Sequence, residues 1–290
     1  MQTSSTQLKR VAAIHDLSGF GRCSLSVILP VISTMGVQVC PVPTAVLSTH
    51  TGGLGDVVLR DLTDYLQPTL EHYRSLQLDF DCIYSGFLSS VEQVDHCLEF
   101  FRAFPNALMV VDPVLGDHGK AYRTCGPELR KRMVELVKVA DIITPNLTEV
   151  SILLGMDYPH EPLTASTAKS MLAKLSELGP GQVVITGANL ADNTLANLGY
   201  DRERGTYWRV NCTYVPVSYP GTGDIFASVL VGGLLTGDSL PIAMDRATKF
   251  IELAIKTTYS YNTDPRYGVM LEKSLNWLTK DNLLTGYQAL

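Results

Sequence analysis

Short apolar runs alternate with longer stretches of helical periodicity over the first two thirds of this chain. The apolar runs are predicted to be strands, and they cover residues 11–15, 37–46, 81–85, 107–114, 141–144 and 182–186. Helices are predicted over residues 23–35, 91–104, 126–139 and 166–178. Because the strands are apolar on both faces, the pattern favours a mostly parallel sheet with helices on both sides.

The pattern changes after residue 193. Turn residues such as Gly199 and Gly205 separate short strand-like runs, and they predict a small β-meander near residues 193–217. Further helices are predicted over residues 224–235, 240–259 and 271–278, and a glycine-containing turn over 18–21. No repeat or linker interrupts the sequence, so we expect one α/β domain over residues 1–290.

Composition narrows the class of protein. Hydrophobic residues make up 46% of the 290 residues and charged residues 18%, as in ordinary globular proteins. The formal net charge of -6 argues against a nucleic-acid partner, which requires a cationic surface. The six cysteines form no CxxC pair and are expected to be thiols of a reducing compartment. The N-terminal residues 1–10 lack a signal-peptide pattern and no apolar stretch would span a membrane, so we expect a cytoplasmic protein.

Polar residues follow the predicted strands at the point where each one ends. They are Asp16 and Ser18, residues 48–53, 85–87, 112–117 and 144–149, and finally Thr186 with Gly187. In open parallel sheets, ligands bind beyond the carboxyl ends of the strands. These side chains are therefore predicted to meet at one edge of the sheet, which indicates an enzyme.

The strongest local motif is Pro-Gly-Thr-Gly-Asp at residues 220–224, directly before an apolar, small-residue helix. A helix N-terminus presents free N–H groups, and glycines let an anion approach them closely. We predict that Gly221, Thr222 and Gly223 bind a phosphoryl group and that Asp224 accepts the proton of an attacking hydroxyl. The alternative is that Asp224 only caps the helix.

Two further acids lie in motifs of their own. Asp112 opens the segment DPVLGDHGKAY at residues 112–122, and Glu149 closes TPNLTE at 144–149. Carboxylates near phosphates suit Mg²⁺, which takes few protein ligands and keeps several waters. Alternatively, Asp112 is a strand-end acid before a proline turn, and Glu149 is the capping-box partner of Asn146.

These three segments, in this order, resemble signatures of the ribokinase-like vitamin kinases. The DPVxGDxGxxY form is similar to that of pyridoxal kinases in particular, and the resemblance covers about residues 110–235, with a fitting N-terminal third. It implies a ribokinase-like fold and ATP-dependent phosphorylation of the 5′-hydroxymethyl group of pyridoxal, pyridoxine or pyridoxamine in vitamin B6 salvage. It also implies Mg²⁺, K⁺ or another monovalent cation, and a homodimer.

The resemblance also assigns residue roles. On the nucleotide side, Asp112 and Glu149 would organise Mg²⁺ through water, and Asp117 and Tyr122 would close over the phosphates. Thr144 and Thr186 would place hydroxyls near the nucleotide and a monovalent cation, and Asn146 and Thr222 would contact phosphate. On the vitamin side, Ser18 and Thr51 lie beside the pyridine ring. Phe87 takes the place of a ring-stacking tyrosine, and Asp224 faces the acceptor hydroxyl.

Other functions remain in view. The stretch Ser18-Gly19-Phe20-Gly21 departs from pyridoxal kinases and leans toward the hydroxymethylpyrimidine kinases of thiamine synthesis. A B6-binding carrier without catalysis is a second alternative, against which the acids at 112, 149 and 224 argue. The first strand is not followed by GxGxxG, which argues against a Rossmann dehydrogenase. The sequence also lacks the GxxxxGK[ST] motif, which argues against a P-loop kinase.

Overall fold

One ten-stranded sheet brings the predicted strand ends together, in the order β12-β11-β10-β9-β8-β5-β4-β1-β2-β3. The computed structural model describes residues 8–280 and 282–290. The neighbouring strands in the middle of the sheet are parallel: β1 (Arg10–Phe20), β2 (Gln38–Thr49), β4 (Cys82–Ser85), β5 (Leu108–Val111), β8 (Ile142–Ile143) and β9 (Gln182–Asn189). Antiparallel strands extend both edges: β3 (Leu59–Asp61), β10 (Leu195–Asp201), β11 (Thr206–Cys212) and β12 (Tyr287–Ala289). The predicted α/β class with a mostly parallel sheet is confirmed.

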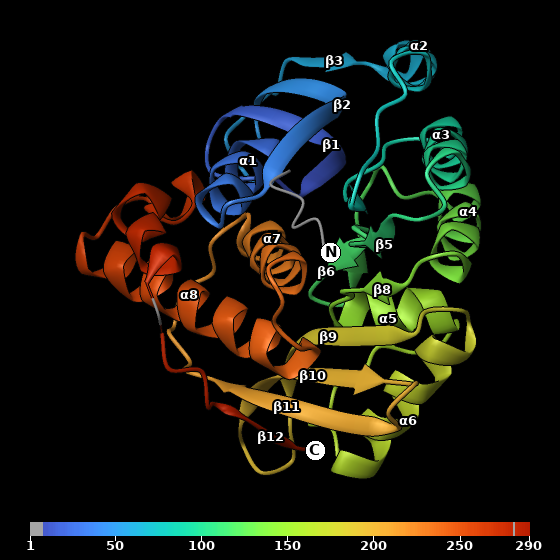
Figure 1. The fold of residues 1–290 in the computed structure, drawn as a ribbon. Helices are drawn as coiled ribbons and strands as arrows, with labels where there is room; N and C mark the ends of the chain where they lie inside the picture. The colour runs from blue at the N-terminus through green and yellow to red at the C-terminus, as the bar shows by residue number, and fades with distance from the viewer. Residues whose placement is uncertain (1–7, 281) are drawn as a thin grey trace, which may run out of the picture.

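Helices cover both faces of the sheet, as Figure 1 shows. One face carries α1 (Leu25–Thr34), α7 (Thr222–Leu235) and α8 (Leu240–Ser260). The other face carries α2 (Thr63–Ser75), α3 (Val91–Ala103), α4 (Pro127–Lys138), α5 (Leu147–Leu154) and α6 (Ala165–Glu177). Successive residues of a strand point to opposite faces, so Tyr84 packs with the α7 side and Ile83 with the other. Each face therefore has its own apolar core.

The parallel register aligns the strand ends that position the site. Ser85 pairs with Val111, and Val111 pairs in turn with Ile143. The residues that follow these strands, Asp112 and Thr144, therefore leave the same edge of the sheet. This is the edge to which α7 directs its N-terminus.

Several sequence predictions are wrong in detail. Residues 18–21 do not form a turn after a short strand, because β1 stays paired with β2 as far as Phe20 and Thr49. The helix predicted at 271–278 is instead a pair of short 3-10 helices, Leu271–Lys273 and Leu275–Thr279, which follow a third at Pro265–Tyr267. The predicted meander is present as β10 and β11, but residues 213–217 lie in no strand.

Other elements were not predicted at all. They are α2, the short edge strands β3 and β12, and the hairpin of β6 (Gly116–Asp117) and β7 (Lys120–Ala121). Residues 1–7, part of the N-terminal segment in which we expect no signal peptide, lie outside the described residues.

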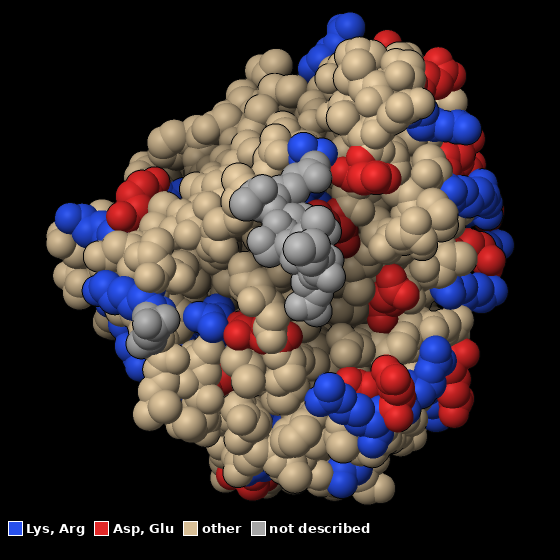
Figure 2. All heavy atoms as spheres, viewed as in Figure 1, with Lys and Arg blue, Asp and Glu red and all other residues tan. Residues whose placement is uncertain are grey.

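The surface in Figure 2 carries charges of both signs. On this face, Lys and Arg alternate with Asp and Glu along the side that α3, α4 and α6 form, so no field of one sign dominates there. Among the helices in the described part of the chain, none combines the length and the apolar character that crossing a bilayer requires.

The packing of α2 gives a first test of the fold. Leu66 of α2 is fully buried, whereas Leu76 at the end of the same helix is 55% exposed. Leu66→Ala is expected to lower the free energy of unfolding by about 2–5 kcal/mol, because it leaves a cavity in the core. Leu76→Ala should change it by less than about 0.5 kcal/mol. Urea denaturation of both variants measures the difference, and equal losses would contradict the observed position of α2.

Candidate active site

The carboxylate of Asp224 faces away from the helix that carries it. Helix α7 has Gly221 as its N-cap residue and no side-chain hydrogen bond at the cap. Asp224 instead accepts hydrogen bonds at Oδ2 from the backbone N–H of Ser24 (2.8 Å) and the thiol of Cys23 (3.2 Å). Its Oδ1 lies 3.1 Å from Nε2 of His15. The capping alternative is therefore wrong, and the first amides of α7 are not used by this side chain.

The two glycines before Asp224 meet different constraints. Gly221 has a φ of 80°, and a Cβ added there would lie 2.1 Å from the carbonyl oxygen of Arg22, so the fold itself requires glycine. A Cβ at Gly223 would meet no atom within 4 Å, and the residue is exposed. Packing therefore does not require glycine at position 223. The absence of a side chain there does leave the N-terminus of α7 accessible.

His15 lies between two carboxylates in the interior. Its Nδ1 is 2.8 Å from Oδ1 of Asp16, its Nε2 is 3.1 Å from Asp224, and only 1% of the residue is exposed. Burial alone would lower the pKa of His15, but the hydrogen bonds and charges of the two acids prevail and raise it from 6.5 to about 10. The backbone N–H of Phe87 also approaches Nε2, at 3.2 Å.

Asp112 and Glu149 form a second acidic pair, which lies away from β1. Asp112 directly follows β5, and Glu149 is in the first turn of α5. Burial and then the charge of Asp224 raise the pKa of Asp112 to about 7. Burial and then the charge of Asp112 raise the pKa of Glu149 well above its usual range. Both shifts have the same physical reason: charged carboxylates are held close together and away from water.

Glu149 also has the structural role that its sequence context suggested. Its Oε2 accepts the backbone N–H of Asn146 at 2.8 Å, while the Asn146 side chain accepts the N–H of Glu149, so the capping box of α5 is formed. Its Oε1 accepts the N–H of Leu115 at 3.1 Å. The capping role and the position beside Asp112 therefore coexist.

The acidic pair fits Mg²⁺ better than a metal that needs a full protein cage. Within residues 8–280 and 282–290, no group of three His, Cys, Asp or Glu side chains could hold a metal. The two hard oxygen donors present would leave the remaining coordination positions to phosphate oxygens and water, which Mg²⁺ accepts. A cation would also offset the repulsion that raises both pKa values.

The β6–β7 hairpin carries two of the predicted nucleotide residues. Asp117 is exposed, and Tyr122, just after the hairpin, is 43% exposed. The hairpin is attached to the start of α5, because the Asn146 side chain donates to the carbonyl of Gly116 at 2.9 Å. Asp117 and Tyr122 therefore lie near the start of α5, the helix that carries Glu149. The pKa of Tyr122 is raised by burial and then by the charge of Asp117.

Two predicted threonines lie on neighbouring strands, Thr144 just after β8 and Thr186 within β9. Thr144 is buried, and its hydroxyl lies beside Asp112, whose pKa it lowers against the larger effect of burial. Thr186 lies in β9 with its backbone N–H bonded to the carbonyl of Pro145. The third hydroxyl, that of Thr222, donates to the carbonyl of Tyr219 at 3.2 Å.

The predicted vitamin side is formed by the ends of β1, β2 and β4. The hydroxyl of Ser18 is buried and donates to Oδ2 of Asp16 at 3.2 Å, and Phe87 is half-buried beside His15. Thr51 is exposed in the loop after β2. His50 orders this loop, since its Nδ1 accepts the N–H of Gly52 and its Nε2 donates to the carbonyl of Arg266.

Sequence reasoning missed several members of this site. They are His15, Ser24 and Tyr84, and Asp16 was noted only as a polar strand end. A usable signal existed for one pair: His15 and Asp16 are consecutive polar residues that directly follow the apolar run 11–14 of β1. Contact with Asp224, 209 positions away from His15, could not be derived from that signal.

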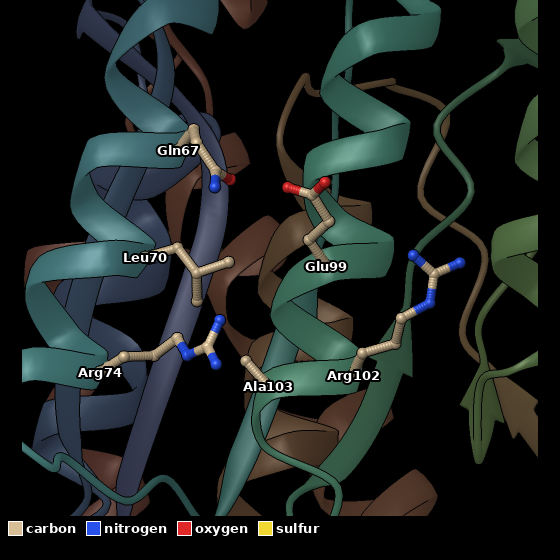
Figure 3. A pocket seen from close by; sticks show the side chains of 6 residues that line it. All are labelled: Gln67, Leu70, Arg74, Glu99, Arg102 and Ala103. Carbon is tan, nitrogen blue, oxygen red and sulfur yellow. The ribbon is translucent and has the colours of Figure 1, made fainter.

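A cavity elsewhere contains none of these residues. It has a volume of about 310 Å³ and lies between α2 and α3, lined by Gln67, Leu70, Arg74, Glu99, Arg102 and Ala103 (Figure 3). The helices that form it cover the face of the sheet opposite α7. We therefore base the candidate site on the side chains at the strand ends.

Comparison with known sequences gives the family. The pattern of the phosphomethylpyrimidine kinase family matches residues 29–269. The thiamine biosynthetic bifunctional enzyme TH1 of Arabidopsis thaliana is 30% identical over 259 residues, which make up 87% of this chain and 48% of that protein. This chain thus spans about half the length of that relative.

Two solved structures are similar over nearly their whole length. A Bacteroides thetaiotaomicron protein, provisionally described as a phosphomethylpyrimidine kinase and crystallised with pyridoxal, is 43% identical, with a TM-score of 0.93 over 98% of this chain and 100% of that one. Pyridoxal kinase from Lactobacillus plantarum is 33% identical, with a TM-score of 0.86 over 94% and 97% of the two chains.

The resemblance to pyridoxal kinases and the ribokinase-like fold are thereby confirmed. Because the family pattern covers most of its length, the chain belongs to the phosphomethylpyrimidine kinase family, as a ribokinase-like phosphotransferase related to the pyridoxal kinases.

Proposed function

We propose that the protein transfers the γ-phosphoryl group of ATP to the 5′-hydroxymethyl group of a B6 vitamer, with the whole chain acting as one kinase domain. The observation that carries the proposal is the placement of Asp224. Its buried carboxylate is held by groups of β1 and of the segment before α1, directly beside the glycine-flanked N-terminus of α7.

This arrangement suits transfer of a phosphoryl group to an alcohol. Asp224 accepts the proton of the hydroxyl as it attacks the phosphorus. The amides around Gly221, Thr222 and Gly223 stabilise the charge on the group in transfer, and the partial positive charge of the helix end adds to this effect. Because the amides are fixed by the fold, they need no reorganisation during the reaction.

Asp112 and Glu149 would hold Mg²⁺ through water. The cation supplies charge neutralisation of the ATP phosphates when bound. On the protein side, Asn146 fixes Glu149 through the capping box, while Asp117 and Tyr122 on and after the hairpin lie where they can cover the phosphates.

The threonines complete the nucleotide side of the proposal. We assign Thr144, Thr186 and Thr222 to hydroxyl contacts with the nucleotide, and the first two also to a monovalent cation such as K⁺. The buried hydroxyl of Thr144 lies beside Asp112, on the side of the site assigned to Mg²⁺ and the phosphates, which supports this assignment.

The acceptor is assigned from the vitamin side and from the relatives. Ser18 lies in β1, Thr51 follows β2 and Phe87 follows β4. These three strands are neighbours in the sheet, and their ends lie on the side of the site where β1 contacts Asp224. The similar Bacteroides structure contains pyridoxal, and the Lactobacillus relative is a pyridoxal kinase. The half-buried ring of Phe87 would pack against the pyridine.

A thiamine-pathway pyrimidine is the second candidate acceptor. The family name and the 30% identity to the thiamine biosynthetic enzyme of Arabidopsis favour it, as does the Ser18-Gly19-Phe20-Gly21 stretch. We also propose a homodimer, from the resemblance alone, and a cytoplasmic location, which the six free cysteines support.

The function is tested by assaying purified protein with Mg-ATP and each of pyridoxal, pyridoxine, pyridoxamine and hydroxymethylpyrimidine. We expect turnover of at least one B6 vitamer, and a loss of about 10²–10⁴-fold in kcat for Asp224→Asn, which keeps the shape of the side chain but removes the base. Vitamer binding without turnover would instead indicate a carrier. Turnover of the pyrimidine alone would favour the second candidate.

Phosphate binding at the N-terminus of α7 is tested by Gly223→Ala. Because a Cβ there meets no protein atom, stability should be unchanged or rise by up to about 1 kcal/mol through better helix propensity. The methyl group would stand where the phosphoryl group approaches the amides, so kcat/KM for ATP should fall about 100-fold. Gly126→Ala, also in open space but at the start of α4, is the matched control. Unchanged ATP kinetics in Gly223→Ala would show that the phosphoryl group does not bind at the N-terminus of α7.

The acidic pair is tested by Glu149→Gln. Glutamine can retain one of the two backbone N–H bonds, so the free energy of unfolding should change by only about 1 kcal/mol. The Mg²⁺ concentration for half-maximal velocity should rise about 10-fold or more, because an organising carboxylate is lost. Glu128→Gln in the exposed first turn of α4 serves as control. An unaltered Mg²⁺ requirement would show that Glu149 acts only as a cap.

A further inference from the structure

Both ring nitrogens of buried His15 lie beside a carboxylate oxygen: Nδ1 beside Asp16 at 2.8 Å and Nε2 beside Asp224 at 3.1 Å. Neutral imidazole has one N–H, so one of the two carboxylates would face a nitrogen lone pair. The imidazolium has two N–H groups and can donate to both. The backbone N–H groups of Asp16 and Phe87 also point at Nδ1 and Nε2, from 3.0 and 3.2 Å, and would suit a lone pair. Each carboxylate, however, carries a full charge, and a charge-assisted hydrogen bond is stronger than one between neutral groups. The geometry therefore favours the cation, and burial of all three groups strengthens the attraction between the opposite charges.

The neighbouring strand provides space for this ring. A Cβ added at Gly86, directly after β4, would lie 1.9 Å from Cδ2 and 2.0 Å from Nε2 of His15. No rotation of a flexible side-chain end removes such an overlap, because the ring is held at both nitrogens. The glycine is therefore required by the position of His15, on the same strand end that leads to Phe87.

The other carboxylate of the arrangement is itself held in place. Asp16 receives the Ser18 hydroxyl at Oδ2, 3.2 Å away, while its Oδ1 faces His15. A chain of contacts thus runs from Ser18 on the proposed vitamin side, through Asp16 and His15, to Asp224. Each link is buried, so groups of β1 orient Oδ1 of Asp224, while the Ser24 N–H and the Cys23 thiol hold its Oδ2.

We infer that His15 is a positioning residue for the proposed reaction: as a buried imidazolium between Asp16 and Asp224, it keeps the Asp224 carboxylate ionised and directed toward the N-terminus of α7. The inference rests on the proposed function for its kinetic consequence, but the charged pair itself is a property of the free protein. His15 touches neither the nucleotide phosphates nor the acceptor in this account; it acts through Asp224.

Several other titratable groups face this pair from the surrounding elements. They are Asp16 of β1, Cys23 before α1, Tyr84 of β4, Asp112 after β5 and Tyr122 after β7. Burial raises the pKa of Cys23 and of Tyr84, so both stay neutral in the physiological range. Burial and then the charge of Asp224 raise the pKa of Asp112, so this group can also change its charge with pH. The effect of His15 is therefore isolated by comparing wild type with a variant at position 15, because both proteins contain Asp112.

The pH dependence of kcat/KM provides that comparison. His15 lowers the pKa of Asp224 through its hydrogen bond and charge, against the burial that raises it. His15→Gln keeps an amide donor but removes the charge, so the acid limb of the profile should move up by about one pH unit or more. We expect kcat to fall about 10-fold or more through the misdirected base, with KM for ATP within about 3-fold of wild type. His96→Gln is the matched histidine control, because the half-buried His96 of α3 also lies beside two carboxylates, those of Glu92 and Glu99, but outside the site.

Nitrogen NMR of the histidine rings tests the charge in the unaltered protein. His15 should remain an imidazolium through pH 8, whereas an ordinary histidine titrates near 6.5. Asp224→Asn should lower the pKa of His15, because one of its two carboxylate partners is removed. A wild-type His15 that titrates near 6.5 would overturn the inference, and this measurement stands even if His15→Gln does not fold.

Stability supplies an independent readout with a defined sign. Because the pKa of folded His15 is raised to about 10, its contribution is complete below 6.5 and is lost as the pH rises toward 10. The difference in unfolding free energy between wild type and His15→Gln should therefore shrink over that interval. A difference that does not vary with pH would indicate packing alone and contradict the proposed charge.

The outcomes separate this inference from the proposed function. If wild-type protein phosphorylates a B6 vitamer but the acid limb of His15→Gln coincides with that of wild type, the role of His15 is wrong and the function stands. If no vitamer is phosphorylated but NMR shows His15 charged and dependent on Asp224, the acceptor is wrong and the pair stands. The same profile is then measured with hydroxymethylpyrimidine.

Discussion

The contact of Asp224 with the first strand is the interaction on which the site depends. A carboxylate can be buried only where donors satisfy it, and here the donors come from His15, Cys23 and Ser24, about 200 positions earlier in the chain. This contact ties the N-terminus of α7 to the edge of the sheet formed by β1. As a result, the helix amides and the carboxylate share one fixed orientation, although α7 carries no side-chain cap of its own.

The same edge concentrates negative charge before any substrate arrives. Asp112 and Glu149 have raised pKa values because burial and neighbouring acids oppose their charged forms. Asp224 has a lowered pKa because His15 supplies a cation. The two ends of the site therefore differ in kind: the β1 end has its own compensating charge, whereas the end near α5 would obtain it from Mg²⁺. This division suits a reaction in which the nucleotide enters with its cation and the alcohol enters neutral.

Local patterns predicted much of this arrangement. Apolar strands gave the parallel sheet, and glycines before Asp224 and the capping pattern of Asn146 with Glu149 placed two helix starts correctly. Local patterns failed where longer-range pairing decided the structure. Residues 18–21 read as a turn because of their glycines, yet pairing with β2 keeps them extended as far as Phe20. Helix α2 has Pro68 inside it and a largely polar sequence, so packing rather than periodicity reveals it. The role of His15 requires a partner on α7, which no local pattern contains.

Acceptor choice and phosphoryl transfer are linked through β1 in this fold. The groups that contact ATP phosphates in our proposal lie on α7, α5 and the β6–β7 hairpin, and they serve any alcohol acceptor equally. The groups that would distinguish pyridine from pyrimidine in our proposal include Ser18 and Phe87. The Ser18 hydroxyl donates to Asp16, so a substitution of Ser18 would also alter the support of Asp224 through the Asp16–His15 pair. Phe87 approaches His15 only with its backbone N–H, which a substitution of its ring leaves in place. Substitutions of the Phe87 ring, and of the loop of Thr51 that His50 orders separately, are therefore the routes to a changed acceptor that leave the base unaltered.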